Sequence, residues 1–160
     1  MDHLISRQMS DQPKILDARG WKLLAALQTD ARAPVKTLAA AAGLSVSAAA
    51  ERLRRLEEAG VIRGYRADVD LGAVGLHVQA VIGITVPQPD KQRFLDHLGG
   101  MAAVQECLHV TGADSYLVRV AVAGMAELER LIEDLNPYGE TRTSIVLSTP
   151  IPSRVPTPSG

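Results

Sequence analysis

Three arginines within four consecutive positions, Arg52, Arg54 and Arg55, form the most basic stretch of the sequence. The segment before them contains Gly43, which can adopt the left-handed conformation that ends a helix. It also contains Ser45, whose hydroxyl group can cap the helix that follows. A helix, a glycine-containing turn and a basic second helix are together typical of a helix-turn-helix. The pattern therefore predicts that this stretch binds double-stranded DNA.

The residues expected to contact DNA lie in the first turns of the second helix and on its basic face. They are Ser45, Ser47, Ala48, Glu51, Arg52, Arg54 and Arg55. Three consecutive alanines, at 48–50, offer few hydrogen-bonding groups, so we expect modest base readout supplemented by DNA shape and dimer spacing. The alternative is a solvated helix whose arginines pair with Glu51, Glu58 and similar residues, and successive positions 54 and 55 point about 100° apart.

A second group of polar residues lies at Thr111-Gly112-Ala113-Asp114-Ser115, between two apolar stretches. Taken alone it predicts a plain hairpin turn, with Gly112 for backbone freedom and Asp114 for turn chemistry. No Ser/His/Asp set, pair of catalytic acids or phosphate-binding loop stands out, so we expect no catalytic residues and no cofactor. Cys107 and His109 are on one strand face, but two ligands without a third do not predict a metal site.

The hydrophobic pattern of the sequence, which predicts the helices and strands that position these residues, changes its period near Gly60. Helical spacing predicts three short helices before it, the first capped by Asp17 and the second entered at Pro34. After it we expect a strand over 61–70 and a glycine-containing connector at 72–75. From His77 onward the pattern predicts strand, helix, strand, strand, helix, strand, the order of a ferredoxin-like domain with two helices on one sheet face.

The other face of this expected sheet is apolar for a surface in contact with water. It would carry Val81, Gly83, Cys107, Leu117, Ala121 and Val146. The simplest way to cover such a face is to pack it against the same face of a second copy. The sequence therefore predicts a homodimer.

The charge distribution divides the chain in two. Residues 14–66 contain ten Lys/Arg and five Asp/Glu, whereas residues 67–150 contain five Lys/Arg and eleven Asp/Glu. This asymmetry predicts a basic module for nucleic acid and a second module with another task. We expect a mobile arm at 1–13, a DNA-binding domain at 14–62, a linker strand and connector at 63–75, a ferredoxin-like domain at 76–150 and a proline-rich tail at 151–160.

The composition excludes several other classes of protein. Hydrophobic residues make up 46% of the chain and charged residues 22%, which is ordinary for a folded protein rather than a disordered one. A single cysteine excludes an intramolecular disulfide framework and fits a reducing compartment. No apolar run approaches the length that spans a bilayer, and no signal-peptide core is visible. We therefore expect a cytoplasmic protein without a membrane partner.

The chain resembles the Lrp/AsnC (leucine-responsive/asparagine regulator) family of transcription factors. The motifs that carry the resemblance cover about 16–150 in order: Leu16-Asp17, Leu38-Ala39, Gly43-Leu44-Ser45, Glu51 to Glu57, Gly60-Val61-Ile62, Gly64-Tyr65, Val110-Thr111-Gly112, Tyr116-Leu117 and Thr141-Arg142-Thr143. The resemblance implies an α+β protein with an N-terminal winged-helix-like helix-turn-helix and a C-terminal ferredoxin-like βαββαβ (ACT-like) domain. It also implies dimers, often assembled into octamers or other rings.

The resemblance further implies that an effector, usually an amino acid, binds between neighbouring sensing domains near the hairpin turn. Carried over to this sequence, the effector-binding residues are Gly112, Ala113, Asp114, Ser115, Tyr116, Thr141 and Thr143. Two positions depart from the family pattern. Gly20 replaces the second acid of the opening motif, and the acid of the turn stands at Asp114, one place early, with Ser115 in its slot. The shifted acid predicts a different ligand or none.

The leading hypothesis is a homo-oligomeric DNA-binding regulator that senses a small metabolite. One alternative is a DNA-architectural protein whose C-terminal domain binds no ligand. Another is a small ferredoxin-like enzyme with a helical extension, because this fold hosts many activities.

Overall fold

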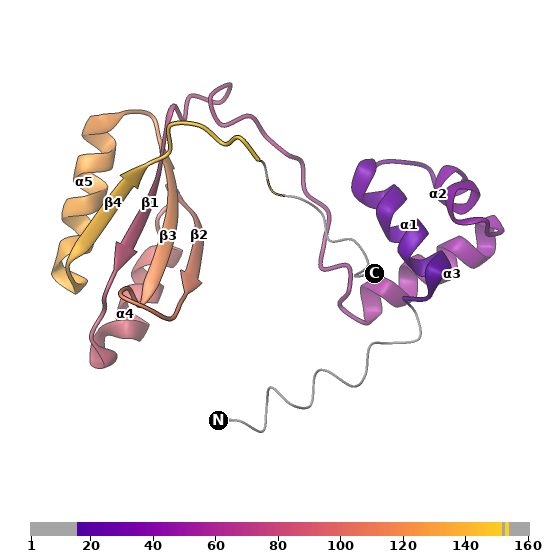
Figure 1. Cartoon of the computed structure of the whole chain (residues 1–160), viewed down its shortest axis with the longest axis horizontal. Coiled ribbons are helices and arrows are strands. Elements are labelled where there is room, and N and C mark those ends of the chain that lie inside the picture. The colour runs from indigo at the N-terminus through magenta and orange to yellow at the C-terminus, as the bar shows by residue number, and fades with distance from the viewer. Residues whose placement is uncertain (1–15, 152, 154–160) are drawn as a thin grey trace. The chain divides into compact units, whose positions relative to one another are not determined.

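The computed structural model describes residues 16–151 and 153, which fall into two compact units that divide between Ala67 and Asp68 (Figure 1). The arm expected at 1–13 lies outside the described residues. So does the tail expected at 151–160, except for Ile151 and Ser153.

The first unit is a bundle of three helices, α1 (Ala18–Thr29), α2 (Val35–Ala42) and α3 (Val46–Glu58). Leucines at helical spacing and the small side chains of the alanines bring the three helices together around one core. The buried members of this core are Leu23, Leu27, Leu38, Ala39, Ala42, Ala49, Leu53 and Leu56.

The helix ends confirm the sequence signals that predicted them. Asp17 caps α1 by accepting a hydrogen bond of 2.8 Å from the Gly20 N–H, and Ser45 caps α3 by accepting one of 3.2 Å from the Ala48 N–H. Gly43 ends α2 in the left-handed conformation with a φ of 64°. Gly43 and Ser45 set the turn between α2 and α3, and with it the direction in which α3 leaves the bundle.

The strand expected over 61–70 is not present, and this prediction was wrong. The N–H groups of Val61 and Ile62 both donate back to the Leu56 carbonyl, at 2.9 and 3.0 Å, and so close the end of α3. A strand exists only through hydrogen bonds to a neighbouring strand. Among the described residues no strand pairs with 63–70, so the segment is extended chain without sheet structure.

The second unit contains a four-stranded antiparallel sheet in the order β2-β3-β1-β4. Its helices and strands, in chain order, are β1 (Val78–Ile84), η1 (Gln88–Asp90), α4 (Lys91–Gly99), β2 (Val104–His109), β3 (Tyr116–Val122), α5 (Met125–Leu135), η2 (Asn136–Tyr138) and β4 (Thr141–Ile145). This order is the predicted ferredoxin-like arrangement. Alternate residues of the strands, such as Ile82 and Val118, are fully buried with Phe94 of α4 and Leu128 of α5.

The two helices therefore cover one face of the sheet (Figure 1). In the register of β1 and β3, Gly83 lies opposite Leu117, Val81 opposite Arg119 and Ala121 opposite Gln79. These residues alternate with the ones that face the helices. The opposite face therefore carries Val81, Gly83, Leu117 and Ala121, as predicted.

Cys107, however, was assigned to the wrong face. An irregularity in β2 lies between Val104, which is opposite Val120, and Glu106, which is opposite Arg119. Such a bulge reverses the alternation of the residues that follow it. Cys107 consequently lies opposite the buried Val118 and packs against the core beneath the helices. Glu106 and Leu108, which lie opposite Arg119 and Leu117, are on the open face where we had expected Cys107.

None of the helices within 16–151 combines the length and apolarity needed to cross a lipid bilayer.

Candidate DNA-binding and effector sites

The first turn of α3 is exposed on the side that faces away from the bundle. Ala49, Leu53 and Leu56 turn one face of α3 into the bundle. Ser45 and Ser47 are exposed at its start, with their hydroxyl oxygens 3.2 Å apart, and Ala48 beside them is half-buried. A helix end with small exposed side chains can approach the edges of bases closely, which suits the predicted recognition role.

Arg52 makes an internal contact. Its guanidinium group donates to both carboxylate oxygens of Asp17, at 2.8 and 2.9 Å, and only 27% of its side chain is exposed. Asp17 also caps α1, and the Gly20 N–H together with Arg52 lowers the pKa of its carboxyl group. The pair joins α3 to the start of α1. The position of Arg52 thus favours a structural role over a contact with DNA.

Arg54 and Arg55 share one acid on their own helix. The Arg54 Nε and Nη2 atoms donate to Glu51 at 3.0 and 2.7 Å, and the Arg55 Nε atom donates to it at 2.9 Å. Arg54 also pairs with Glu58. Hydrogen bonds from Arg54 and Arg55 lower the pKa of Glu51 to about 2. With three Arg and three Glu, α3 carries no net charge.

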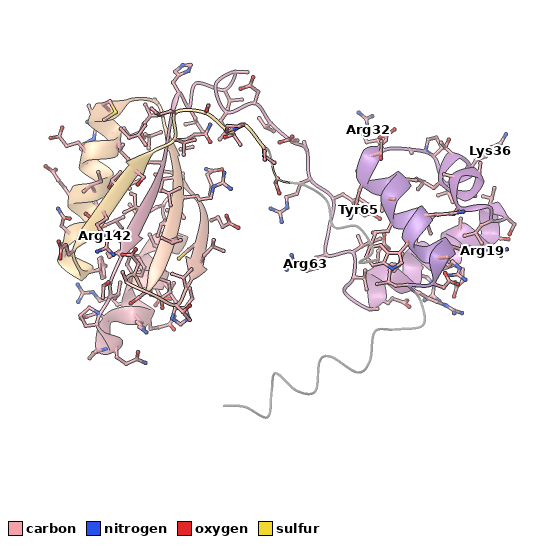
Figure 2. All side chains as sticks on the ribbon, viewed as in Figure 1. Arg19, Arg32, Lys36, Arg63, Tyr65 and Arg142 are labelled. Carbon is pink, nitrogen blue, oxygen red and sulfur yellow. The ribbon has the colours of Figure 1, made fainter. Side chains whose placement is uncertain are left out.

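The excess of positive charge in the first unit is therefore carried outside α3. Six cations of this unit form no ion pair among the described residues. They are Arg19, Lys22, Arg32, Lys36, Arg63 and Arg66. Arg19, Arg32 and Lys36 extend from the bundle, and Arg63 extends from the segment after it (Figure 2). Our sequence prediction did not include these residues. Because α3 is neutral, the net positive charge of 14–66 must come from residues outside this helix, and that comparison would have indicated them.

In the second unit, the hairpin turn places a carboxylate on the face of the sheet opposite the helices. The side chain of Asp114 lies directly over Gly83, where an added Cβ would come within 2.6 Å of its Oδ2 atom. Asp114 also forms an ion pair with Arg142 of β4, and 19% of its side chain is exposed. Gly83 is thus the residue that leaves room for the acid.

The other residues of the turn are held by β1 and by the core. The Ser115 N–H donates to the Ile84 carbonyl at 3.0 Å, and the Thr85 hydroxyl donates to the Ala113 carbonyl at 2.9 Å. Tyr116 is buried and its ring packs against Phe94, with ring centroids 5.3 Å apart. Gly112 has a φ of 121°, a conformation that favours glycine. The turn is therefore a well-supported scaffold for Asp114.

The two threonines of the predicted effector site lie apart from Asp114. Thr143 is opposite Ile82 and Thr141 is opposite Ile84, so both are on the face covered by the helices. The Thr141 hydroxyl donates to the Asn136 side chain at 3.2 Å. Arg142, between them, projects from the other face and meets Asp114. The alternation of β4 was sufficient to place Arg142 beside the turn, but our prediction did not include it.

Within the described residues, no three His, Cys, Asp or Glu side chains are grouped as a metal site would require. Burial beneath the helices raises the pKa of the Cys107 thiol, which makes it a poor thiolate ligand.

Comparison with protein families finds both halves of the chain. An AsnC-type helix-turn-helix domain matches residues 16–57, and an Lrp/AsnC ligand binding domain matches residues 79–156. Among curated proteins, the HTH-type transcriptional regulator LrpA of Mycobacterium tuberculosis is 38% identical over 133 residues, covering 79% of this chain and 87% of that protein.

Solved structures resemble the chain over most of its length. The feast or famine regulatory protein of M. tuberculosis complexed with L-methionine has a TM-score of 0.81 and 37% identity, covering 89% of this chain and 99% of that one. LrpC of Bacillus subtilis has a TM-score of 0.82 and 27% identity, covering 86% of this chain and 99% of that one. With its helix-turn-helix, its ferredoxin-like unit and these relatives, the chain belongs to the Lrp/AsnC family of transcriptional regulators.

Proposed function

We propose that the protein binds double-stranded DNA with the first turns of α3 against the base edges. The observation that carries this proposal is the turn between α2 and α3, where Gly43 and Ser45 adopt the conformations that a helix-turn-helix requires. The exposed Ser47 and half-buried Ala48 are the residues placed for close contact. Because α3 is neutral, its role is to fit the groove, and phosphate binding falls to cations elsewhere in the unit.

A single added charge tests this assignment. Ser47 is exposed, so Ser47→Glu should leave the fold intact, but it brings a carboxylate toward DNA and should weaken binding by tenfold or more. Binding is measured by fluorescence anisotropy on duplexes selected from a random pool. Ala102→Glu adds the same charge at an exposed position of the second unit and should have little effect. Equal behaviour of the two variants would argue against the proposed orientation of α3.

We further propose that the second unit binds an amino acid at the turn 112–116. Asp114 and Arg142 together provide a partner for an ammonium group and a partner for a carboxylate, on the same sheet face. The match to a ligand-binding domain and the methionine complex of a relative support this choice of ligand. Thr141 and Thr143 lie on the other face, so we place them in the support of β4 rather than in contact with the ligand.

A thermal-shift screen with the twenty amino acids tests the ligand proposal. A ligand present at a hundred times its dissociation constant stabilises the folded protein by about 2.7 kcal/mol, which raises the melting temperature by several degrees. Asp114→Asn should abolish the shift, whereas Thr143→Val, on the helix-covered face, should retain it. If no amino acid produces a shift, the result favours the alternative of a DNA-architectural protein whose second unit binds no ligand. The ion pair that already satisfies Asp114 is the observation that favours that alternative.

The proposed assembly is a homodimer, with higher oligomers such as an octamer built from it. The sheet face opposite the helices supports this, because Leu108 is 43% exposed opposite the half-buried Leu117, and Val81 of β1 on the same face is also half-buried. A ligand bound at Asp114, on this same face, would change the stability of the dimer, and by reciprocity the dimer would change the affinity for the ligand.

A further inference from the structure

A cavity in the first unit has no part in the sites described above. It has a volume of about 300 Å³ and lies between α1 and residues 61–66, the segment that follows α3. Leu24, Leu27 and Val61 form an apolar floor, Gln28, Arg63 and Arg66 add three polar side chains, and Tyr65, whose hydroxyl donates to Glu57, also lines the cavity. No acidic residue is part of its lining, which distinguishes it from the charged surface of α3.

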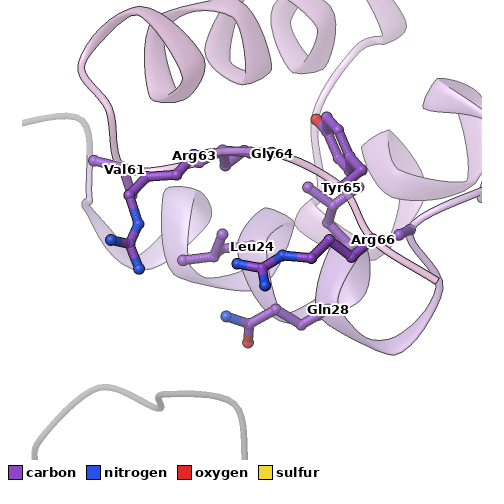
Figure 3. A pocket seen from close by; sticks show the side chains of 10 residues that line it. Leu24, Gln28, Val61, Arg63, Gly64, Tyr65 and Arg66 are labelled. Atoms are coloured by element: carbon purple, nitrogen blue, oxygen red, sulfur yellow. The ribbon is translucent and has the colours of Figure 1, made fainter. Parts of the chain in front are cut away.

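The three polar side chains are on the same side of the segment. Arg63 and Arg66 both extend toward the side on which Leu24 and the amide group of Gln28 lie (Figure 3). Gly64 lies between the two arginines and has a φ of 153°. Two guanidinium groups and one amide group therefore present hydrogen-bond donors toward the same volume.

The backbone that carries the arginines is anchored at both ends. At one end, the N–H groups of Val61 and Ile62 donate to the Leu56 carbonyl. At the other, the Tyr65 hydroxyl donates to Glu57 of α3 at 2.7 Å, and partial burial together with Glu57 raises the pKa of Tyr65 to about 12. Tyr65 consequently remains a neutral hydrogen-bond donor at physiological pH. The donors are held on a supported segment rather than on a free loop.

Charge indicates which ligand this arrangement suits. Neither Arg63 nor Arg66 forms an ion pair with another described residue, whereas Arg52, Arg54 and Arg55 are all paired. Arginine binds phosphate through paired hydrogen bonds, and the apolar floor can take the sugar or base attached to a phosphate.

We propose that Arg63, Arg66 and Gln28 form a binding site for the phosphate group of a nucleotide. The phosphate accepts hydrogen bonds from both guanidinium groups and from the Gln28 amide, and its nucleoside lies against Leu24 and Val61. The phosphate can belong to the DNA backbone or to a free nucleotide. The first possibility rests on the proposed DNA binding, and the second does not.

The experiment uses the full chain and the double variant Arg63→Gln/Arg66→Gln. The matched control is Lys91→Gln/Arg130→Gln, which removes the same charge from the second unit. Each protein is titrated with inorganic phosphate and with deoxynucleoside monophosphates while the backbone resonances of 61–66 are followed by NMR. Each is also bound to duplex DNA at several salt concentrations, and thermal melting confirms that every variant folds.

Two results support the site and identify the source of the phosphate. A backbone phosphate is indicated if the slope of log K against log salt becomes shallower by about 0.9 in the Arg63/Arg66 variant and not in the control, since each neutralised phosphate contributes about 0.9. A free nucleotide is indicated if the slope is unchanged while nucleotide shifts at 61–66 appear in the wild type and disappear in the variant.

The proposal is overturned if the variant matches the control in both measurements. This outcome is distinct from failure of the proposed function. A wild-type protein that binds no duplex would refute DNA binding, and the nucleotide titration would then decide the site alone. Gln28→Leu provides a second check, because it keeps the charge and removes one donor, and it should weaken nucleotide binding less than the double variant does.

Discussion

At the scale of single residues, Glu51 controls how much positive charge α3 presents. It accepts hydrogen bonds from both Arg54 and Arg55, so one carboxylate neutralises much of the stretch that first suggested DNA binding. Asp17 does the same for Arg52 from a different helix. Exposed ion pairs contribute little to stability, but their effect on the field around the helix is direct.

Replacing Glu51 by Gln should therefore strengthen DNA binding and steepen its salt dependence, because Arg55 loses its ion pair and Arg54 keeps only the one with Glu58. The slope of log K against log salt should grow by up to about 1.8. Glu129→Gln removes the same charge from α5 and should leave the slope unchanged. Equal slopes for wild type and Glu51→Gln would mean that neither arginine reaches DNA.

The same variant has a predictable dependence on pH. The pKa of Glu51 is lowered to about 2 in the folded protein from an ordinary 4.5, so its ion pairs stabilise the fold fully above pH 4.5. This contribution is lost as the pH falls from 4.5 toward 2. Melting temperatures measured across this range should decline less steeply for Glu51→Gln than for wild type. Added salt should reduce the difference, because these groups are exposed.

At the scale of elements, Gly139 allows the chain before β4 to pass close to the backbone that follows β1. A Cβ added at this position would lie 2.1 Å from the Thr85 carbonyl oxygen and 3.1 Å from the carbonyl carbon, and backbone atoms cannot move aside as the end of a flexible side chain can. A survey of side-chain contacts would miss this steric constraint, because glycine has no side chain. The close approach determines where η2 ends and where Thr141 joins the sheet.

Gly139→Ala should therefore destabilise the second unit by about 1–3 kcal/mol, the usual cost of forcing atoms into a packed site. Gly99→Ala is the control, because a Cβ there meets no atom within 4 Å and lies in α4, where alanine is the better helix former. Urea denaturation should show a lower midpoint for the first variant and an equal or higher one for the second. A midpoint unchanged by Gly139→Ala would show that β4 can shift freely.

At the scale of the whole molecule, the proposed function depends on a dimer that holds two helix-turn-helix units. A helix-turn-helix dimer binds half-sites about 34 Å apart, or a multiple of that spacing, so loss of the dimer costs DNA affinity even when each bundle is intact. The Leu108–Leu117 pair on the open sheet face is the surface that we propose for this contact. Its polar neighbours include the Glu106–Arg119 ion pair, with an N–O distance of 3.7 Å.

The double variant Leu108→Glu/Leu117→Glu should be a monomer in light scattering and should bind duplexes with two half-sites at least tenfold more weakly. Leu95→Glu, at an exposed position of α4 on the other side of the sheet, should keep the assembly of the wild type. A double variant that remains a dimer would place the interface elsewhere.

The sequence by itself determined the features that depend on neighbours along the chain. Caps at Asp17 and Ser45 and the left-handed Gly43 each act within a few residues, so the three helices could be inferred directly. Strand alternation and helical spacing likewise predicted the order of strands and helices after His77, and the ordered motifs carried the resemblance to the family. The strand expected at 61–70 failed because a strand needs a partner, and that partner is not specified locally.

Only the tertiary structure decided which groups meet. Asp17 reaches Arg52 across 35 positions, and Asp114 reaches Arg142 across 28. The bulge in β2 moved Cys107 to the other face, and the fold brought Arg63 and Arg66 beside Gln28. The reason is physical. Periodicity and capping are properties of one segment, whereas ion pairs and cavities arise from packing between segments, which contributes free energy only when the whole unit is folded.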